Sequence, residues 1–301
     1  MSQREHFSSY FTGLFEASGG IYIPKGKYPK IYINFHKDNL PLANIIRDRI
    51  GFGALYEKKT GLSYEIFNKE GILRFIEITS KYYRTPKIEN FNEMINYLNN
   101  NKNQSLSLAI LDKSPFESNA WLSGYLETSG SFFVCLSIYE YFVFGTGDDC
   151  RLNESLIRQT TFELKHKKDS KSSYELFLYK LASFFETSLK EKKAFNDPCF
   201  TIRFVNYNSV SILINYLNKY PLFGIQYINY CIFKNGYNSS MADVVYKTKT
   251  KDTKENKEYI IREILEIHPV TFEKYNHFNS PVEEIKANYI KEHLILFPKL
   301  D

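Results

Sequence analysis

Two short stretches of this sequence place small and acidic residues at the same spacing. The first, FTGLFEASG, runs from Phe11 to Gly19, and the second, LSGYLETSG, runs from Leu122 to Gly130. Position eight, counted from the first residue of each stretch, is Ser18 in one and Ser129 in the other. Two carboxylates at these positions would hold a divalent metal beside a phosphodiester and support metal-assisted hydrolysis. A serine hydroxyl is neutral and a poor Mg²⁺ ligand, so we expect this chemistry to be absent.

The nearest acids are Glu16 and Glu127, at position six of the two stretches. Two residues along an α-helix correspond to a rotation of about 200°, so these carboxylates are predicted to point away from position eight. The sequence therefore predicts no catalytic residues and no metal ligands, with serine at both of the positions where carboxylates would hold the metal.

Both stretches are expected to be helices that pair with each other. Positions three and seven are small and lie four residues apart, which puts them on one helix face. Small side chains allow two helix backbones to approach closely. The residues predicted to form this seam between the halves are Gly13, Ala17, Gly124 and Thr128. A glycine at position nine of each stretch suits a helix end that leads directly into a strand.

The chain is interpreted as an internal duplication, because the two stretches are offset by 111 positions and each leads into an apolar, strand-like run. The order helix, hairpin, helix, hairpin, helix is expected twice. The helix that follows Glu89 is matched with the one that follows Asn208. This predicts an α+β fold with a half at 1–103, a linker at 104–118, a second half at 119–235 and a C-terminal extension at 236–301.

Alternation along the strands predicts one covered and one open sheet face. In IYINFH, Ile31, Ile33 and Phe35 share one face. The other faces carry polar and basic residues that can contact phosphates and base edges, although a merely solvated sheet face shows the same alternation. The candidate nucleic-acid contacts are Lys25, Lys27, Lys30, Tyr32, Asn34, His36, Lys58, Lys59, Arg158, Lys165, Lys190, Lys192 and Arg203.

With the flanking stretches YYRTPKIENFNEMINYLNNNKN and INYLNKYPLFGIQYINY, the two motifs resemble the double-motif LAGLIDADG proteins. This is the family of intron-encoded homing endonucleases and group I intron maturases, and the resemblance covers about residues 7–235. It implies two αββαββα halves related by a pseudo-twofold axis, with a saddle of antiparallel sheets lying on duplex nucleic acid. It also implies that active members bind Mg²⁺ through the position-eight acids and cut both DNA strands.

The chain departs from the family pattern at the residues that serve cleavage. Besides Ser18 and Ser129, the basic residue expected near the scissile phosphate is Lys87 in the first half and is replaced by Gln226 in the second. His166 also stands where the family commonly has glutamine. The helix faces, the glycines and the alternating strands are kept, so we expect the fold and nucleic-acid binding to be retained without cutting.

The predicted function is that of a catalytically inactive LAGLIDADG protein that binds structured RNA. Its ligand would be a group I intron, as for a maturase, or an organellar ribosomal RNA within a ribonucleoprotein. The first alternative is an active homing endonuclease that cuts or nicks duplex DNA, and Mg²⁺ is expected only in that case. The second is a scaffold that contacts mainly protein. Internal pseudo-symmetry predicts a monomer, with protein partners considered for the C-terminal extension.

Composition limits the other classes of function. The net charge of +5 is compatible with nucleic-acid binding, and no apolar run approaches the roughly 18 residues that a membrane span needs. The four cysteines have no metal-ligand spacing and are expected to be free thiols.

Heavy use of Tyr, Phe, Asn, Ile and Lys is typical of an AT-rich coding sequence, which together with the resemblance predicts a mitochondrial or other organellar location. The lysine-rich Tyr246–Glu258 is interpreted as a linker or as a basic arm ordered by RNA.

Overall fold

The computed structural model of the chain describes residues 1–144, 150–167, 174–194, 197–241 and 293–300. The chain divides into two compact units, each of which is described by itself. The first unit contains Met1–Ser131, Phe162–Tyr227 and Lys291–Asp301, and the second contains Phe132–Thr161 and Ile228–Ile290. Both motif stretches belong to the first unit.

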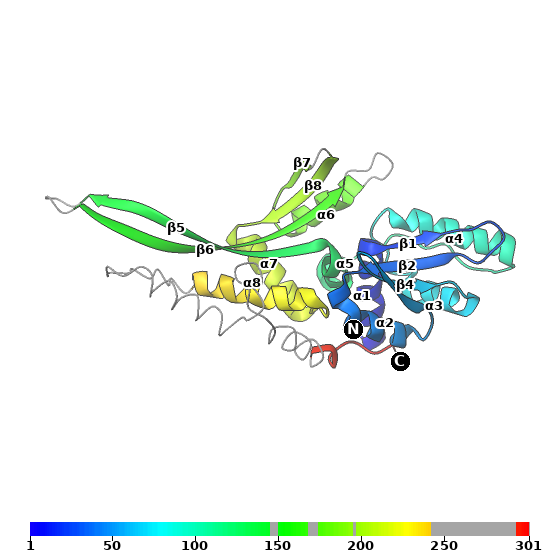
Figure 1. The fold of residues 1–301 in the computed structure, drawn as a ribbon. Coiled ribbons are helices and arrows are strands. Elements are labelled where there is room, and N and C mark those ends of the chain that lie inside the picture. Colours follow the sequence, from blue (N-terminus) through cyan, green and yellow to red (C-terminus); the bar gives the residue numbers. More distant parts are fainter. Residues whose placement is uncertain (145–149, 168–173, 195–196, 242–292, 301) are drawn as a thin grey trace. The chain divides into compact units, whose positions relative to one another are not determined.

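The first half of the chain folds into one four-stranded antiparallel sheet with helices (Figure 1). The strand order is β1-β2-β4-β3. Along the chain the elements are α1 (Gln3–Ser18), β1 (Gly19–Tyr22), β2 (Lys30–Phe35), the 3-10 turn η1 (Lys37–Asn39), α2 (Leu40–Ile50), β3 (Ala54–Lys58), β4 (Gly61–Ile66), α3 (Lys69–Thr79) and α4 (Lys87–Lys102).

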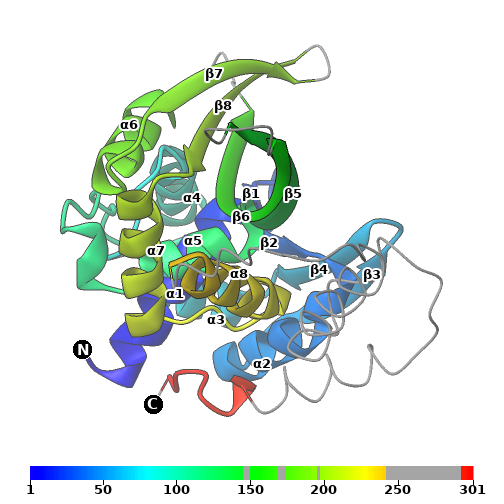
Figure 2. The ribbon, with the colours of Figure 1, turned by 90° about the vertical axis from the view of Figure 1, so that its left-hand side faces the viewer.

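Local sequence explains where these elements begin and end. Ser2 and Glu5 form a reciprocal capping box that satisfies backbone donors at the start of α1. Gly51 ends α2 at a φ of 81°, a left-handed conformation that costs glycine little. In β2, Ile31, Ile33 and Phe35 are buried while Asn34 is exposed, which confirms the predicted alternation. Helices α1 and α2 pack on this sheet, and α3 packs against both of these helices (Figure 2).

The second half repeats this plan. After the short 3-10 turn η2 (Phe116–Ser118), the elements are α5 (Trp121–Ser129), β5 (Gly130–Phe144), β6 (Cys150–Lys167), α6 (Tyr174–Phe184), β7 (Leu189–Ala194), β8 (Asp197–Phe204), α7 (Tyr207–Lys219) and α8 (Ile225–Met241). The strand order is β5-β6-β8-β7, which matches the order in the first sheet. The predicted α+β fold with two similar halves is therefore confirmed.

Each half contains one helix more than was expected, since both end on two helices rather than one. Helices α3 and α7 each follow the last strand of their sheet directly, and α4 and α8 each come next. The helix after Asn208 therefore corresponds to α3, and matching it with the helix after Glu89 was wrong. The similarity of the two NYLN segments reflects two amphipathic helices and not the same place in the fold.

The linker between the halves is held against α4 by two asparagines. The amide of Asn92 both donates to and accepts from the backbone of Ala109, at 3.0 and 2.9 Å. Asn99 does the same with the backbone of Leu106, at 2.9 Å each way. These side chains satisfy linker backbone groups that no sheet ladder serves.

Residues 293–300, at the end of the C-terminal extension, belong to the first unit and pack against its aromatic side chains. The Phe297 ring is buried against Phe7, Tyr10 and Phe223. The imidazole of His293 lies parallel to the Tyr227 ring with the ring centres 3.5 Å apart. The lysine-rich Tyr246–Glu258 lies outside the described residues, so neither interpretation of it is tested.

The second unit contains most of the β5–β6 ribbon and most of α8 (Figure 1). In it, the Phe132 ring packs on Tyr230 and Phe233. Over the parts of the chain that the structure describes, no helix has the length and apolar character that a bilayer crossing needs.

Candidate functional site

Helices α1 and α5 cross backbone to backbone at two glycines. A Cβ added to Gly13 would overlap the carbonyl oxygen of Trp121, and one added to Gly124 would overlap that of Tyr10. The structure thus places Gly13 and Gly124 at the centre of the crossing. Ala17 and Thr128 follow one turn later and are half-buried.

Ser18 and Ser129 end the two helices and turn their hydroxyls inward along the helix. The Ser18 hydroxyl donates to the carbonyl of Leu14, at 3.3 Å, and the Ser129 hydroxyl donates to that of Tyr125. Such bonds to the residue four positions earlier are a common alternative for serine in a helix. Both hydroxyl protons are therefore used within their own helix.

The carboxylate of Glu16 is buried and accepts four hydrogen bonds. Two come from the backbone N–H groups of Arg84 and Thr85, at 3.0 and 2.8 Å. The hydroxyl of Thr85 donates at 2.6 Å, and the Nε1 of Trp121 donates from the opposite motif helix at 2.7 Å. Glu16 therefore joins α1, the segment just before α4, and α5.

Glu127 makes the corresponding set of contacts in the second half. It accepts from the backbone N–H groups of Phe223 and Gly224, at 2.8 and 3.0 Å, and from the Tyr10 hydroxyl, at 2.7 Å. The expectation that neither position-six acid reaches position eight is confirmed, because both are turned into the core and are only about 1 to 2% exposed.

Burial dominates the titration of these acids. It raises the pKa of Glu16 to about 7, against the opposing effect of the four donors. Burial likewise raises the pKa of Glu127, and burial with the nearby Glu127 charge raises that of Tyr10. The raised pKa values mean that the folded state favours the protonated form of both acids.

Lys87 and Gln226 take corresponding places at the ends of the motif helices. The Lys87 ammonium donates to the carbonyls of Gly19, at 2.6 Å, and Phe15, at 3.3 Å. The Gln226 amide donates to the carbonyl of Gly130, at 3.2 Å. A cation at a helix C-terminus complements the helix dipole. Burial lowers the pKa of Lys87 to about 8.

The groups at these helix ends do not fit a divalent metal. Mg²⁺ is normally held by one or two carboxylates together with water. Here the position-eight groups are hydroxyls bonded to their own helices, and the position-six carboxylates are occupied by backbone donors. Within the described ranges, no three His, Cys, Asp or Glu side chains come together in a way that could hold a metal ion.

His166 lies on β6 beside the start of α6. Its ring meets the Tyr174 ring edge to face at 4.2 Å, and its Nε2 is buried without a hydrogen-bond partner. Burial lowers the pKa of His166, and the charge of Lys87 lowers it further. His166 is therefore held neutral and packs as an aromatic residue.

The open face of the first sheet, formed by the residues that alternate with the buried ones, carries a carboxylate among its predicted lysines. Glu65 on β4 lies 2.5 Å from the Lys30 ammonium on β2 and 3.2 Å from that of Lys58 on β3. Tyr32 lies beside them, with its ring across the backbone of Gly20. The structure thus places Lys30, Tyr32, Asn34 and Lys58 on one face, with both lysines paired to an acid.

The remaining candidates of the first half lie at its edges. Lys25 and Lys27 are exposed in the β1–β2 loop, and Lys59 is exposed in the β3–β4 turn. The prediction for His36 was wrong in one respect: β2 ends at Phe35, so His36 is not a strand residue. It caps η1 and pairs with Asp38 at 3.2 Å instead.

The second sheet repeats the combination of acid and base. Arg203 on β8 is exposed and its guanidinium lies 2.9 Å from the nearly buried carboxylate of Glu163 on β6. Lys190 on β7 is exposed. The side chains of Arg158, Lys165 and Lys192 lie outside what the structure describes.

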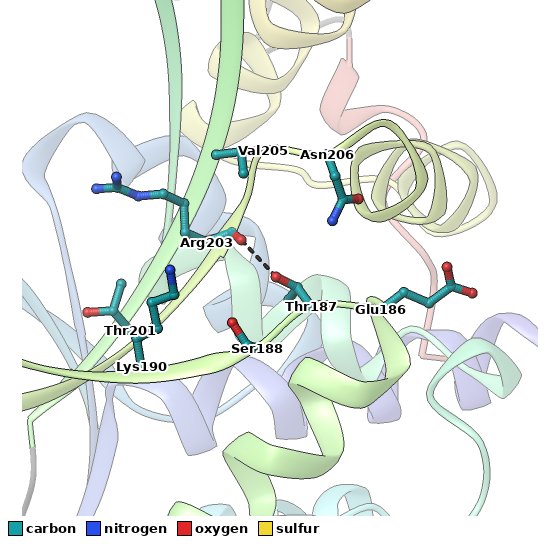
Figure 3. Close-up of a pocket in the computed structure, with 8 residues that line it drawn as sticks. All are labelled: Glu186, Thr187, Ser188, Lys190, Thr201, Arg203, Val205 and Asn206. Atoms are coloured by element: carbon teal, nitrogen blue, oxygen red, sulfur yellow. Dashed lines mark hydrogen bonds between the residues drawn. The ribbon is translucent and has the colours of Figure 1, made fainter.

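A cavity of about 460 Å³ opens beside Arg203 at one end of this sheet (Figure 3). The Thr187 hydroxyl donates to the Arg203 carbonyl across it, at 3.0 Å. The residues that line it are Glu186, Thr187, Ser188, Lys190, Thr201, Arg203, Val205 and Asn206.

Sequence reasoning missed four residues of these faces. The tyrosines Tyr22 and Tyr56 are exposed on the first open face, and the acids Glu65 and Glu163 are central to the two faces. Period-two alternation contained the signal for the tyrosines. The acids were passed over because only basic and neutral polar side chains were considered as nucleic-acid contacts.

Comparison with known proteins agrees with this architecture. Residues 11–98 and 122–237 match the family model described as LAGLIDADG endonuclease. The chain is 30% identical over 148 residues to "Intron-encoded DNA endonuclease aI3" of Saccharomyces cerevisiae, which covers 42% of this chain and 36% of that protein. It is 24% identical over 234 residues to "Probable intron-encoded endonuclease 4" of Neurospora crassa, covering 76% of this chain and 39% of that protein. The chain thus spans less than two fifths of the length of these curated relatives.

Solved structures share the fold. The LAGLIDADG meganuclease I-AabMI bound to uncleaved DNA aligns with a TM-score of 0.58 at 16% identity, over 87% of this chain and 98% of that one. The LAGLIDADG homing endonuclease I-GzeII in complex with its DNA target aligns with a TM-score of 0.58 at 17% identity, over 89% and 99%. With the two motif helices crossing at their glycines and the family match covering both halves, this chain belongs to the LAGLIDADG endonuclease family.

Proposed function

We propose that this LAGLIDADG protein binds structured RNA and does not cut nucleic acid. The observation that carries the proposal is the state of the two helix ends, where Ser18 and Ser129 bond to their own helices. The acids nearest to them, Glu16 and Glu127, hold the seam together instead. A shape-reading RNA-binding role needs the basic sheet faces and no metal.

The proposal includes a biological setting. The RNA is a group I intron, for which the protein acts as a maturase, or an organellar ribosomal RNA. The protein acts as a monomer in a mitochondrion or another organelle, and its C-terminal extension is open to protein partners. AT-rich composition and the intron-encoded relatives support this setting.

The test pairs RNA crosslinking of the native protein with a Mg²⁺ cleavage assay on a randomised duplex DNA library. We expect crosslinks concentrated on one structured RNA and no cleavage. Cuts or nicks by the unaltered protein at a defined DNA site would overturn the proposal. Crosslinks spread evenly over unrelated RNAs would remove the claim of a structured target.

Restoring the acids tests whether the scaffold is otherwise intact. The double variant Ser18→Asp with Ser129→Asp regains carboxylates at both helix ends, and we expect Mg²⁺-dependent nicking that the unaltered protein lacks. The variant Ser18→Asn with Ser129→Asn has nearly the same shape without charge and is the matched control. Equal activity in both double variants would show that the added carboxylates are not metal ligands.

A second candidate, an active endonuclease on duplex DNA, is favoured by the names of the relatives and by the DNA bound in the structural neighbours. It requires metal ligands other than the motif acids. The same cleavage assay decides between the two candidates.

A further inference from the structure

The two open sheet faces each hold a carboxylate under their cations. Lysines from β2 and β3 converge on Glu65 of β4, and the Ser63 hydroxyl donates to the same carboxylate at 3.1 Å. The Glu65 side chain is only 10% exposed, whereas those of Lys30 and Lys58 are 40% and 49% exposed. Glu65 thus lies beneath two lysines whose side chains are partly exposed to solvent.

The second sheet also has a nearly buried carboxylate covered by an exposed cation, although the residues do not correspond to those of the first sheet. The Glu163 side chain is 6% exposed, and the Arg203 side chain that covers it is 48% exposed. The acid comes from the second strand of that sheet rather than from the last, so it is not a copy of Glu65. Two independent placements of an acid under a basic face argue against a chance pairing.

These acids are not needed for stability to any large extent. Ion pairs with one partner this exposed contribute about 0 to 1 kcal/mol. Burial by itself would raise the pKa of Glu65, but the bonds from Lys30, Lys58 and Ser63 outweigh it and hold that pKa below its usual value. The carboxylate is therefore charged in the free protein and occupies both lysines.

An occupied lysine pair has a direct consequence for nucleic-acid binding. Phosphates can draw both Lys30 and Lys58 away only by leaving the Glu65 carboxylate with Ser63 as its one donor among the described residues, close to a polyanion, which is repulsive. The penalty disappears when a base offers an exocyclic amino group, because Glu accepts from such groups, as it does from cytosine N4. Bases that present only acceptors retain the penalty.

We infer that Glu65 is a specificity-determining residue that withholds Lys30 and Lys58 from phosphates until a base amino group replaces them on its carboxylate. This inference rests on the proposed function, since it needs a nucleic acid on the open face. It names the recognised group, an exocyclic base amino group, which both an RNA and a DNA duplex can supply.

The experiment compares Glu65→Gln with Glu57→Gln in the full chain. Glu57 is exposed on the neighbouring strand β3 and points to the opposite side of the sheet from Glu65, so its substitution removes the same charge without freeing a lysine. Affinity for mixed-sequence RNA and for mixed-sequence duplex DNA is measured across salt concentrations. Selections from randomised RNA and duplex libraries then report the base preference of each variant.

Releasing Lys30 and Lys58 from Glu65 should change the affinity for nucleic acid and its salt dependence in a defined way. We expect Glu65→Gln to bind mixed sequences more tightly and to steepen the slope of log affinity against log salt by about 1.4 on single strands or 1.8 on duplex, for two added contacts. We also expect it to lose a preference for an amino-bearing base at one selected position. If the unaltered protein binds but Glu65→Gln matches Glu57→Gln in slope and preference, the inference is wrong.

A second variant covers the case in which Glu65→Gln fails to fold. In Lys30→Met with Lys58→Met, the salt slope on mixed sequences should stay at the unaltered value, while the slope on the selected target becomes shallower by about 1.4 to 1.8. A slope that falls equally on both ligands would overturn the inference. Absence of any binding by the unaltered protein would instead overturn the proposed function, and so the two failures are distinguishable.

Discussion

Trp121 on α5 donates a hydrogen bond of 2.7 Å to the buried carboxylate of Glu16 on α1. Tyr10 on α1 donates one of the same length to Glu127 on α5. Tyr10 and Trp121 lie 111 positions apart, as do Glu16 and Glu127, so the two bonds are related by the internal duplication. Each motif helix thus contributes one acid and one aromatic donor to the seam. The acids at position six, the only ones in the two motifs, are structural for this reason.

Removing one aromatic donor should loosen the seam. In Tyr10→Phe the hydroxyl that serves Glu127 is lost while the ring is kept, so we expect a loss of about 1.5 to 3 kcal/mol in the free energy of unfolding. Denaturant titration measures it. Tyr56→Phe, on the exposed open face, is the control and should change stability by less than about 0.5 kcal/mol. Equal effects in the two variants would contradict the role given to this bond.

The glycine contact makes a steric prediction. A methyl group at Gly124 overlaps the Tyr10 carbonyl, and the rigid helices cannot both remain in place. Gly124→Ala is expected to cost about 3 kcal/mol or more. Gly51→Ala meets no atom within 4 Å but adopts a φ of +81°, so it should cost only about 1 kcal/mol of backbone strain. The chain has a single tryptophan, and the fluorescence of Trp121 should shift in the first variant only. If the emission of Gly124→Ala is unchanged, the added methyl group does not displace the helix that carries Trp121, and the predicted clash is wrong.

Glu16 predicts a pH dependence of stability. Its folded pKa of about 7 lies above the ordinary value of 4.5, so its stabilising contribution is complete below pH 4.5 and is lost as the pH rises through 7. The total change is about 3 kcal/mol. We expect the unfolding free energy of the unaltered protein to fall relative to that of Glu16→Gln as the pH rises from 5 to 8. Because Glu127 is present in both proteins, its own titration does not contribute to this difference. A difference that stays constant with pH would show that Glu16 keeps one charge state throughout.

The docked C-terminal segment should contribute to the stability of the first unit. Phe297 is buried among three aromatic rings, two from α1 and one from Phe223 just before α8, and Phe297→Ala should cost about 3 to 5 kcal/mol. Ile295, two residues earlier, is 81% exposed and provides the control, with an expected change below about 0.5 kcal/mol for Ile295→Ala. Thermal unfolding of the full chain checks both. Similar behaviour of the two variants would mean that the segment does not remain docked in solution.

Local patterns predicted the architecture well because they depend on backbone geometry alone. Period-two alternation identified the buried face of β2, and small residues four apart identified the face on which α1 meets α5. The same reasoning failed for His36, because where a strand stops depends on the turn that follows it. It also mismatched the helices after Glu89 and Asn208, because amphipathic helices of similar composition occur at different places in one fold.

By itself, the sequence determined that this chain is a duplication, that its motif helices pair and that serine stands at both acid positions. The tertiary structure alone decided the partners of the charged groups. The donors to Glu16 come from residues 68 to 105 positions away, and the lysines on Glu65 come from two other strands. The physical reason is that periodicity is a property of each element, whereas the partner of a buried charge depends on which distant elements pack around it.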